Sequence, residues 1–283
     1  MVEFIEIIKA AILGIIQGVT EWLPISSTGH MILFDSLWPL KASDDFKDMF
    51  DVVIQLGSIL AVLVVYFSRL NPWSRKKTPE ENKYTLNLWG KIIVAAIPAA
   101  IAGVFLDDII STYLGGYAVV AAALIVYGIA FIIIERSKKN TVPRIQKAED
   151  IDIKTALSIG AFQVLSLVPG TSRSGSTIVG AMLVGVSRTA AAEFSFFLAI
   201  PIMFGASGLR GLKYALKVAG GEAEMFGATE FAVLLVGTAV AFFVSLAVIK
   251  FLVSFVRRHS FESFGWYRIA LGALVLVYFG LVR

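Results

Sequence analysis

Two short stretches of the sequence place ionisable side chains within otherwise apolar surroundings. QGVTEWLPISSTGH (17–30) contains Glu21 and His30, and PGTSRSGST (169–177) contains Arg173. An ionisable residue at membrane depth is costly and usually marks a functional site. We therefore take these three residues as candidates for chemistry. The alternative is that Glu21 and Arg173 form an ion pair that only holds the two stretches together.

Hydroxyl residues and glycines surround these charges in both stretches, just before a new apolar run begins. Glycine lets a ligand approach the backbone closely, and free N–H groups at a helix start favour phosphate. The guanidinium of Arg173 adds a planar fork that matches phosphate oxygens. The alternative for such clusters is close helix packing through small residues. The predicted phosphate-binding residues are Ser26, Thr28, Gly29, Gly170, Thr171, Ser172, Ser174, Gly175 and Ser176.

Ser27 and His30 lie one helical turn apart if a helix begins at Ser27. Either Ser27 attacks as a nucleophile with His30 as its base, or His30 attacks with Ser27 as a hydrogen-bond donor. Glu21 would orient the base or hold a divalent cation, Mg²⁺ or Ca²⁺, with Gln17 as a weaker ligand. The predicted catalytic residues are Glu21, Ser27, His30 and Arg173.

The composition shows what kind of molecule must position these residues. The 283 residues are 57% hydrophobic and 16% charged, and the mean hydropathy is +0.80. Soluble domains are about half apolar and about one quarter charged, so a soluble enzyme is excluded and an all-α polytopic membrane protein is predicted. The formal charge of +4 is spread over short segments and indicates topology, not a nucleic-acid partner. The six predicted membrane spans are 48–67, 86–106, 115–134, 190–207, 231–249 and 265–282.

Two further apolar regions are interrupted by the stretches described above. Apolar runs 4–16 and 31–40 flank the first stretch, and runs 155–168 and 178–186 flank the second. Irregular backbone at membrane depth is tolerated only where it is buried in protein or lines a polar cavity. Each region therefore predicts a re-entrant helix–loop–helix element.

Basic residues predict the orientation of the chain. Lysine and arginine gather in segments 68–85, 135–154 and 250–264, which the positive-inside rule places in the cytoplasm. Segments 107–114 and 208–228 are then outside, so the region 155–186 begins and ends on the cytoplasmic side. This count independently supports a re-entrant second element.

The two halves of the chain resemble each other. Gln17, Thr20, Pro24, Ser26 and Ser27 align with the residues Gln163, Ser166, Pro169, Thr171 and Ser172 if one residue is shifted. One re-entrant element and three spans per half would make the second half inverted relative to the first, a known architecture. We predict a single membrane domain, 1–283, with repeat halves of about 1–134 and 153–283 joined by a basic cytoplasmic loop, 135–152.

QGVTEWLPISSTGH, PGTSRSGST and the following GAMLVGVSRTAAAEFSFFLAIP (180–201) closely resemble the undecaprenyl-diphosphate phosphatase family of the bacitracin-resistance type. The resemblance covers nearly the whole chain. It implies a multi-pass hydrolase of the bacterial plasma membrane that converts undecaprenyl diphosphate to undecaprenyl phosphate and inorganic phosphate. This reaction recycles the lipid carrier for cell-wall synthesis, so the implied partners are this lipid substrate and the membrane lipids.

The same resemblance assigns roles to residues. The family motif E/Q-x-x-x-E falls on Gln17 and Glu21, and this chain has the glutamine variant. The first position therefore brings no negative charge to a divalent cation. The serine, histidine and arginine of the family fall on Ser27, His30 and Arg173. The resemblance also points to the outer membrane face and leaves a homodimer open.

A transporter or flippase for a polyprenyl phosphate is the alternative function. Such a protein would share inverted repeats and charges near the membrane midplane. A candidate nucleophile, base and phosphate cradle in the same two stretches favour a hydrolase. Release of phosphate by the purified protein in detergent, where transport has no meaning, would separate the two functions.

Overall fold

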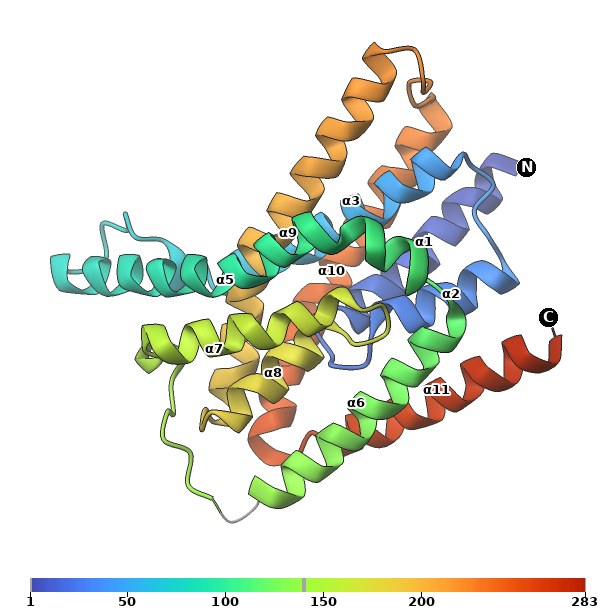
Figure 1. The fold of residues 1–283 in the computed structure, drawn as a ribbon. Helices are drawn as coiled ribbons and strands as arrows, with labels where there is room; N and C mark the ends of the chain where they lie inside the picture. Colours follow the sequence, from blue (N-terminus) through green and yellow to red (C-terminus); the bar gives the residue numbers. More distant parts are fainter. Residues whose placement is uncertain (1, 139–140, 283) are drawn as a thin grey trace.

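The computed structural model describes residues 2–138 and 141–282, and these residues are almost entirely helical (Figure 1). Residues 139 and 140 of the predicted basic loop lie outside the described residues. Within them, an isolated β-bridge joins Ile145 to Val186. The helices are α1 (Val2–Thr20), α2 (Ser27–Leu37), α3 (Asp44–Val65), α4 (Phe67–Leu70), α5 (Pro79–Tyr113), α6 (Tyr117–Lys138), α7 (Ile153–Val164), α8 (Arg173–Leu183), α9 (Arg188–Ala219), α10 (Ala228–Arg258) and α11 (Glu262–Val282), with 3-10 turns at Ala148–Asp150 and Leu165–Leu167.

Six helices are long and apolar enough to cross a membrane: α3, α5, α6, α9, α10 and α11. They confirm the six predicted spans and the all-α polytopic class. Several extend beyond the predicted apolar limits, so the predicted outer segments 107–114 and 208–228 are largely helical. α5 ends at Tyr113 and α9 at Ala219, each just before a glycine pair. Apolar composition marks the hydrocarbon boundary, whereas a helix continues until residues such as glycine end it.

Both interrupted regions fold as helix–loop–helix elements. Residues 21–26 separate α1 from α2, and residues 165–172 separate α7 from α8. α1 has 19 residues and starts at Val2, earlier than the predicted apolar run, and within it Lys9 pairs with Glu6 at 2.9 Å. Re-entry on one membrane side and the inverted repeat stay predictions.

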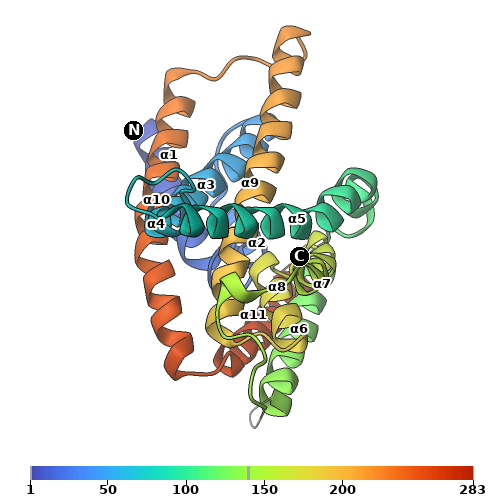
Figure 2. The same ribbon diagram turned by 90° about the vertical axis from the view of Figure 1, so that its left-hand side faces the viewer.

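Helix packing brings the two elements together in the middle of the molecule. α10 lies along α1 and α3, α11 lies along α6, and α5 crosses the direction of α9 and α10 (Figure 2). Small residues allow these close contacts. A Cβ on Gly14 of α1 would lie 2.5 Å from the carbonyl oxygen of Gly237 in α10. α8 packs between α7 and α9 and is buried from Ser174 to Met182, so the loop before it is held rigidly.

Candidate active site

The loops before α2 and α8 end in the same unusual backbone geometry. Ser26 and Ser172 have φ values of 72° and 71°, and among the described residues they are the non-glycine residues with positive φ. Each side-chain oxygen caps the following helix by accepting a hydrogen bond from a glycine N–H, Gly29 at 3.4 Å and Gly175 at 3.2 Å. Such a conformation is costly and is found mainly at functional sites.

These caps revise the predicted alignment of the two halves. Ser26 follows Gln17 at the same spacing along the chain as Ser172 follows Gln163. The structure therefore pairs Ser26 with Ser172 and needs no residue shift at this point. With this register, Arg173 occupies the position that Ser27 has in the first half.

An ion pair between Glu21 and Arg173 joins the two loops. Nη2 of Arg173 donates to Oε1 of Glu21 at 2.9 Å, and Nε2 of Gln17 donates to Oε2 of Glu21 at 3.0 Å. Nη1 of Arg173 donates to the carbonyl oxygen of Ser195 in α9 at 2.8 Å. The side chains of Arg173 and Glu21 are 12% and 9% exposed, so water screens this pair weakly.

Aromatic packing fixes the guanidinium between these partners. The Arg173 guanidinium carbon lies 5.5 Å from the ring centre of Trp22, which is fully buried. The Trp22 ring in turn meets Phe196 of α9 edge to face at 5.3 Å. A cation over an indole face is stabilised by the ring quadrupole, so Arg173 is held in one orientation.

A cavity of about 190 Å³ lies where the two loops meet. Glu21, Ser27 and Thr28 line it from the first element, and Gly170, Ser172 and Arg173 line it from the second. Three apolar residues of α9 form another part of its wall: Ile202, Met203 and Ala206. The structure therefore brings a hydroxyl, a carboxylate and a guanidinium to one enclosed space.

A second cavity of about 270 Å³ adjoins the first along α2 and α3. Ser27, Thr28 and Gln55 line both cavities, so they form the boundary between them. Asp35 of α2 and Asp51 of α3 line the second cavity beyond this boundary. The candidate site therefore extends into the space between α1, α2 and α3. Gln55 was not expected from the sequence, because a glutamine within an apolar span carries no motif.

The other predicted phosphate-binding residues are buried outside the cavity, and some of them bond to the backbone of the loops. Ser26, Gly29, Thr171, Ser174, Gly175 and Ser176 are buried and do not line it. Ser174 Oγ donates to the backbone carbonyl of Glu21 at 3.2 Å, and Ser176 Oγ donates to that of Ser172 at 3.1 Å. Of the nine predicted residues, Thr28, Gly170 and Ser172 reach the cavity.

His30 lies apart from the cavity and has partners at both ring nitrogens. Nδ1 lies 2.7 Å from the carbonyl oxygen of Ser26, and Nε2 lies 2.7 Å from the hydroxyl of Tyr267 in α11. A carbonyl can only accept, so Nδ1 carries a proton, and in the neutral ring Nε2 accepts from the hydroxyl of Tyr267. The two rings also stack, with an angle of 10° between them. The structure thus does not bring His30 to the Ser27 hydroxyl.

Arg268 is a buried arginine that the sequence analysis did not single out. It lies in α11 with no exposed surface, and its guanidinium donates to the carbonyl oxygens of Pro24 at 3.2 Å and of Gly170 and Thr171, both at 2.9 Å. One side chain thus binds the backbone of both loops. The sequence does hold a signal, because Arg268 is the charged residue inside the predicted span 265–282.

Comparison with known proteins places this site in a family. The family model described as "Bacitracin resistance protein BacA" matches residues 10–274, which include both loops and Arg268. This chain belongs to the BacA family.

Several proteins named undecaprenyl-diphosphatase are similar in sequence to this chain over nearly their full length. An undecaprenyl-diphosphatase of Enterococcus faecalis is 52% identical over 275 residues, covering 97% of this chain and 98% of that protein. An undecaprenyl-diphosphatase of Streptococcus thermophilus is 51% identical over 277 residues, covering 97% and 93%. One of Acetivibrio thermocellus is 50% identical over 279 residues, covering 99% and 100%. The sequence similarity therefore extends over nearly the whole of this chain.

The BacA-family site offers few ligands for a divalent cation. Across 2–138 and 141–282 no group of three or more histidines and carboxylates has metal-site geometry. Glu21 lines the cavity between the two loops, and both its oxygens accept hydrogen bonds. Mg²⁺ commonly uses one or two carboxylates together with substrate phosphates. Glu21 and the amide oxygen of Gln17 fit a cation that a diphosphate also binds, but not a cage built of protein ligands alone.

Proposed function

We propose that this protein hydrolyses undecaprenyl diphosphate to undecaprenyl phosphate and inorganic phosphate in the bacterial plasma membrane. The observation that carries the proposal is the cavity between the two loops, where Ser27, Glu21 and Arg173 meet. The relatives named undecaprenyl-diphosphatase support the same substrate. The reaction would return the lipid carrier to cell-wall synthesis.

The terminal phosphate would bind between the loops with Arg173 as its main cationic partner. Nε of Arg173 is buried and has no hydrogen-bond partner among the described atoms. An unsatisfied buried donor costs free energy, which an arriving phosphate oxygen would recover. The apolar wall of Ile202, Met203 and Ala206 would face the first part of the prenyl chain.

Ser27 is the proposed nucleophile, and His30 is assigned a positioning role. Ser27 lines the cavity, whereas both nitrogens of His30 are engaged with Ser26 and Tyr267. His30 would fix the backbone of Ser26 and so the direction of the first turn of α2. The nucleophilic alternative, attack by His30, would require this ring to leave both partners.

The chemistry would proceed in two displacements. Oγ of Ser27 attacks the terminal phosphorus, its proton passes to the Glu21 carboxylate, and the anhydride P–O bond breaks to release undecaprenyl phosphate. Glu21 releases this proton to solvent and then takes a proton from the water that attacks the seryl phosphate; as the Oγ–P bond breaks, the proton passes to Oγ of Ser27 and inorganic phosphate leaves. Each carboxylate oxygen of Glu21 accepts one hydrogen bond and keeps a second lone pair, so the carboxylate can accept the proton while Arg173 stays in place. Arg173 binds the charge that develops on the phosphoryl oxygens.

A divalent cation, Mg²⁺ or Ca²⁺, is also proposed. Glu21 and Gln17 would hold it beside the diphosphate, and when bound it would neutralise charge on the phosphate oxygens.

Phosphate release from undecaprenyl diphosphate by the purified protein in detergent tests the proposal. The native chain and Ser158→Ala, a matched change on α7 outside the cavity, should release phosphate at similar rates. Ser27→Ala should lose nearly all activity, since its alanine side chain cannot attack phosphorus. A native protein that releases no phosphate would contradict the proposal and favour transport of a polyprenyl phosphate.

A further inference from the structure

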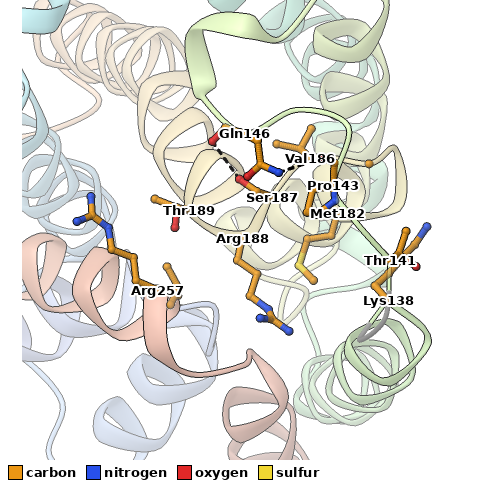
Figure 3. Close-up of a pocket in the computed structure, with 12 residues that line it drawn as sticks. Lys138, Thr141, Pro143, Gln146, Met182, Val186, Ser187, Arg188, Thr189 and Arg257 are labelled. Atoms are coloured by element: carbon orange, nitrogen blue, oxygen red, sulfur yellow. Dashed lines mark hydrogen bonds between the residues drawn. The ribbon is translucent and has the colours of Figure 1, made fainter.

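A third cavity lies at the opposite end of α8 from Arg173. Its volume is about 480 Å³, which is within the ~300–1,000 Å³ typical of ligand sites. It is enclosed by the C-terminal ends of α6 and α10, by residues 141–146, and by the turn between α8 and α9 (Figure 3). We call it the basic pocket.

The lining of the basic pocket carries positive charge and no negative charge. Lys138, Arg188 and Arg257 line it, and no aspartate or glutamate is among the described lining residues. Figure 3 shows Arg188 between Arg257 on one side and Lys138 on the other.

Two of these three charges are not neutralised by an ion pair. Arg188 donates from Nε to both carboxylate oxygens of the buried Glu135, each at 3.0 Å. For Lys138 and Arg257, the described part of the chain contains no ion-pair partner. Lys138 and Arg257 therefore bring unpaired positive charge to the rim of the pocket, which an anion would complement.

Hydroxyl groups and apolar side chains complete the lining. Ser187 and Thr189 bring hydroxyls next to Arg188, and Met182, Val186 and Val256 bring apolar surface. An inorganic ion needs no apolar wall, whereas a lipid head group joined to its glycerol and acyl chains does. The combination of cations, hydroxyls and apolar contacts fits an amphiphilic anion.

The place of the pocket in the fold agrees with that ligand. Lys138 and Arg257 lie at the ends of membrane-spanning helices, in the two basic segments 135–154 and 250–264. Basic pockets between spanning helices on the cytoplasmic side are a recurrent form of anionic-lipid site. We propose that the basic pocket binds the head group of an anionic phospholipid of the inner leaflet.

Binding there would stabilise the contact between residues 145–146 and the turn between α8 and α9. The backbone of residues 145–146 is bound to the α8–α9 turn, with Ile145 N–H donating to Gly185 at 3.1 Å and Ser187 N–H donating to Ile145 at 2.8 Å. Ser187 Oγ also donates to the carbonyl of Gln146 at 3.2 Å, as drawn in Figure 3. A ligand that contacts both walls should raise the thermal unfolding temperature of the protein.

The test is thermal unfolding of the purified full chain in neutral detergent micelles with added phosphatidylglycerol or phosphatidylcholine. Phosphatidylglycerol should raise Tm by several degrees and phosphatidylcholine should not. The double variant Lys138→Gln/Arg257→Gln should lose at least half of this rise. The matched control Lys250→Gln/Arg258→Gln removes the same charges from α10 residues outside the pocket and should keep the full rise.

Three results would overturn the proposal. They are an equal rise with phosphatidylcholine, a full rise in the Lys138→Gln/Arg257→Gln variant, and an equal rise with the same concentration of inorganic phosphate or glycerol phosphate in place of lipid. The last result would assign the pocket to a free anion. The readout needs no catalysis, so its failure would leave the proposed hydrolase function untouched.

Discussion

Replacing Arg173 by lysine tests whether the guanidinium does more than hold the two loops together. The substitution keeps the positive charge and the ion pair with Glu21, so folding and membrane insertion should survive. The substitution removes the planar guanidinium. In the native protein this group donates from Nη2 to Glu21 at 2.9 Å and from Nη1 to the Ser195 carbonyl at 2.8 Å. A lysine ammonium is a single point charge on a flexible stem and cannot reproduce both directions.

The expected loss follows from the number of donors removed. Loss of one preorganised donor to a transition-state oxygen typically costs about 10²–10³-fold in kcat, or ~2.7–4 kcal/mol. Arg173→Lys also loses the fixed orientation over Trp22, where the guanidinium carbon lies 5.5 Å from the ring centre. We therefore expect at least a 10²-fold decrease in kcat with a smaller change in KM.

The assay is phosphate release from undecaprenyl diphosphate in detergent, with monodispersity and Tm measured on the same samples. Arg136→Lys is the matched control, because Arg136 also pairs with a carboxylate, Glu262, at 2.5 Å but is not among the residues that line the cavity. The control should keep native turnover. If Arg173→Lys keeps more than about a third of native kcat, the guanidinium has a structural role only and the proposed phosphate contact is wrong.

Three further predictions concern charge, loop support and topology. Glu21→Gln should abolish phosphate release at every Mg²⁺ and Ca²⁺ concentration. Gln17→Glu should stay active but change the cation concentration needed for the half-maximal rate. An active Glu21→Gln variant would refute the base and cation roles of that carboxylate. Arg268→Gln should lower Tm markedly, since loop carbonyls in a buried site lose their donor; an unchanged Tm in a thermal scan would contradict this. A cysteine at position 187 should resist an impermeant outside reagent that labels one at position 220, and equal labelling would refute the re-entrant second element.

Much of the fold follows from the sequence because the membrane imposes simple rules. Six apolar runs gave six spanning helices, and the two runs broken by glycine, proline and hydroxyl residues gave two helix–loop–helix elements. Helix ends were less predictable. Apolar composition shows where a helix leaves the hydrocarbon, but it does not show where the helix ends. α5 and α9 continue past that boundary to the glycine pairs that follow them.

The site was predicted in part. An ion pair between Glu21 and Arg173 was the alternative to a chemical role, and the structure does pair them, at 2.9 Å. Their chemical role stays a prediction. The spacing of Ser27 and His30 suggested a nucleophile–base pair, but sequence spacing cannot reveal that Tyr267, from α11, occupies one ring nitrogen of His30. The hydrogen-bond partners of a side chain such as His30 depend on contacts between helices that are far apart in the sequence. The role of Arg268 was equally hidden, because the sequence does not show which backbone carbonyls a buried cation will reach.

The most direct test of the central claim is to trap the phosphorylated residue. The protein would be mixed with undecaprenyl diphosphate labelled in its terminal phosphate, quenched within a single turnover, and digested to locate the label. The account predicts an acid-stable phosphate ester on Ser27 that forms before inorganic phosphate appears and is absent from Ser27→Ala. An acid-labile label on His30, or release of phosphate with no labelled protein at any time, would contradict it.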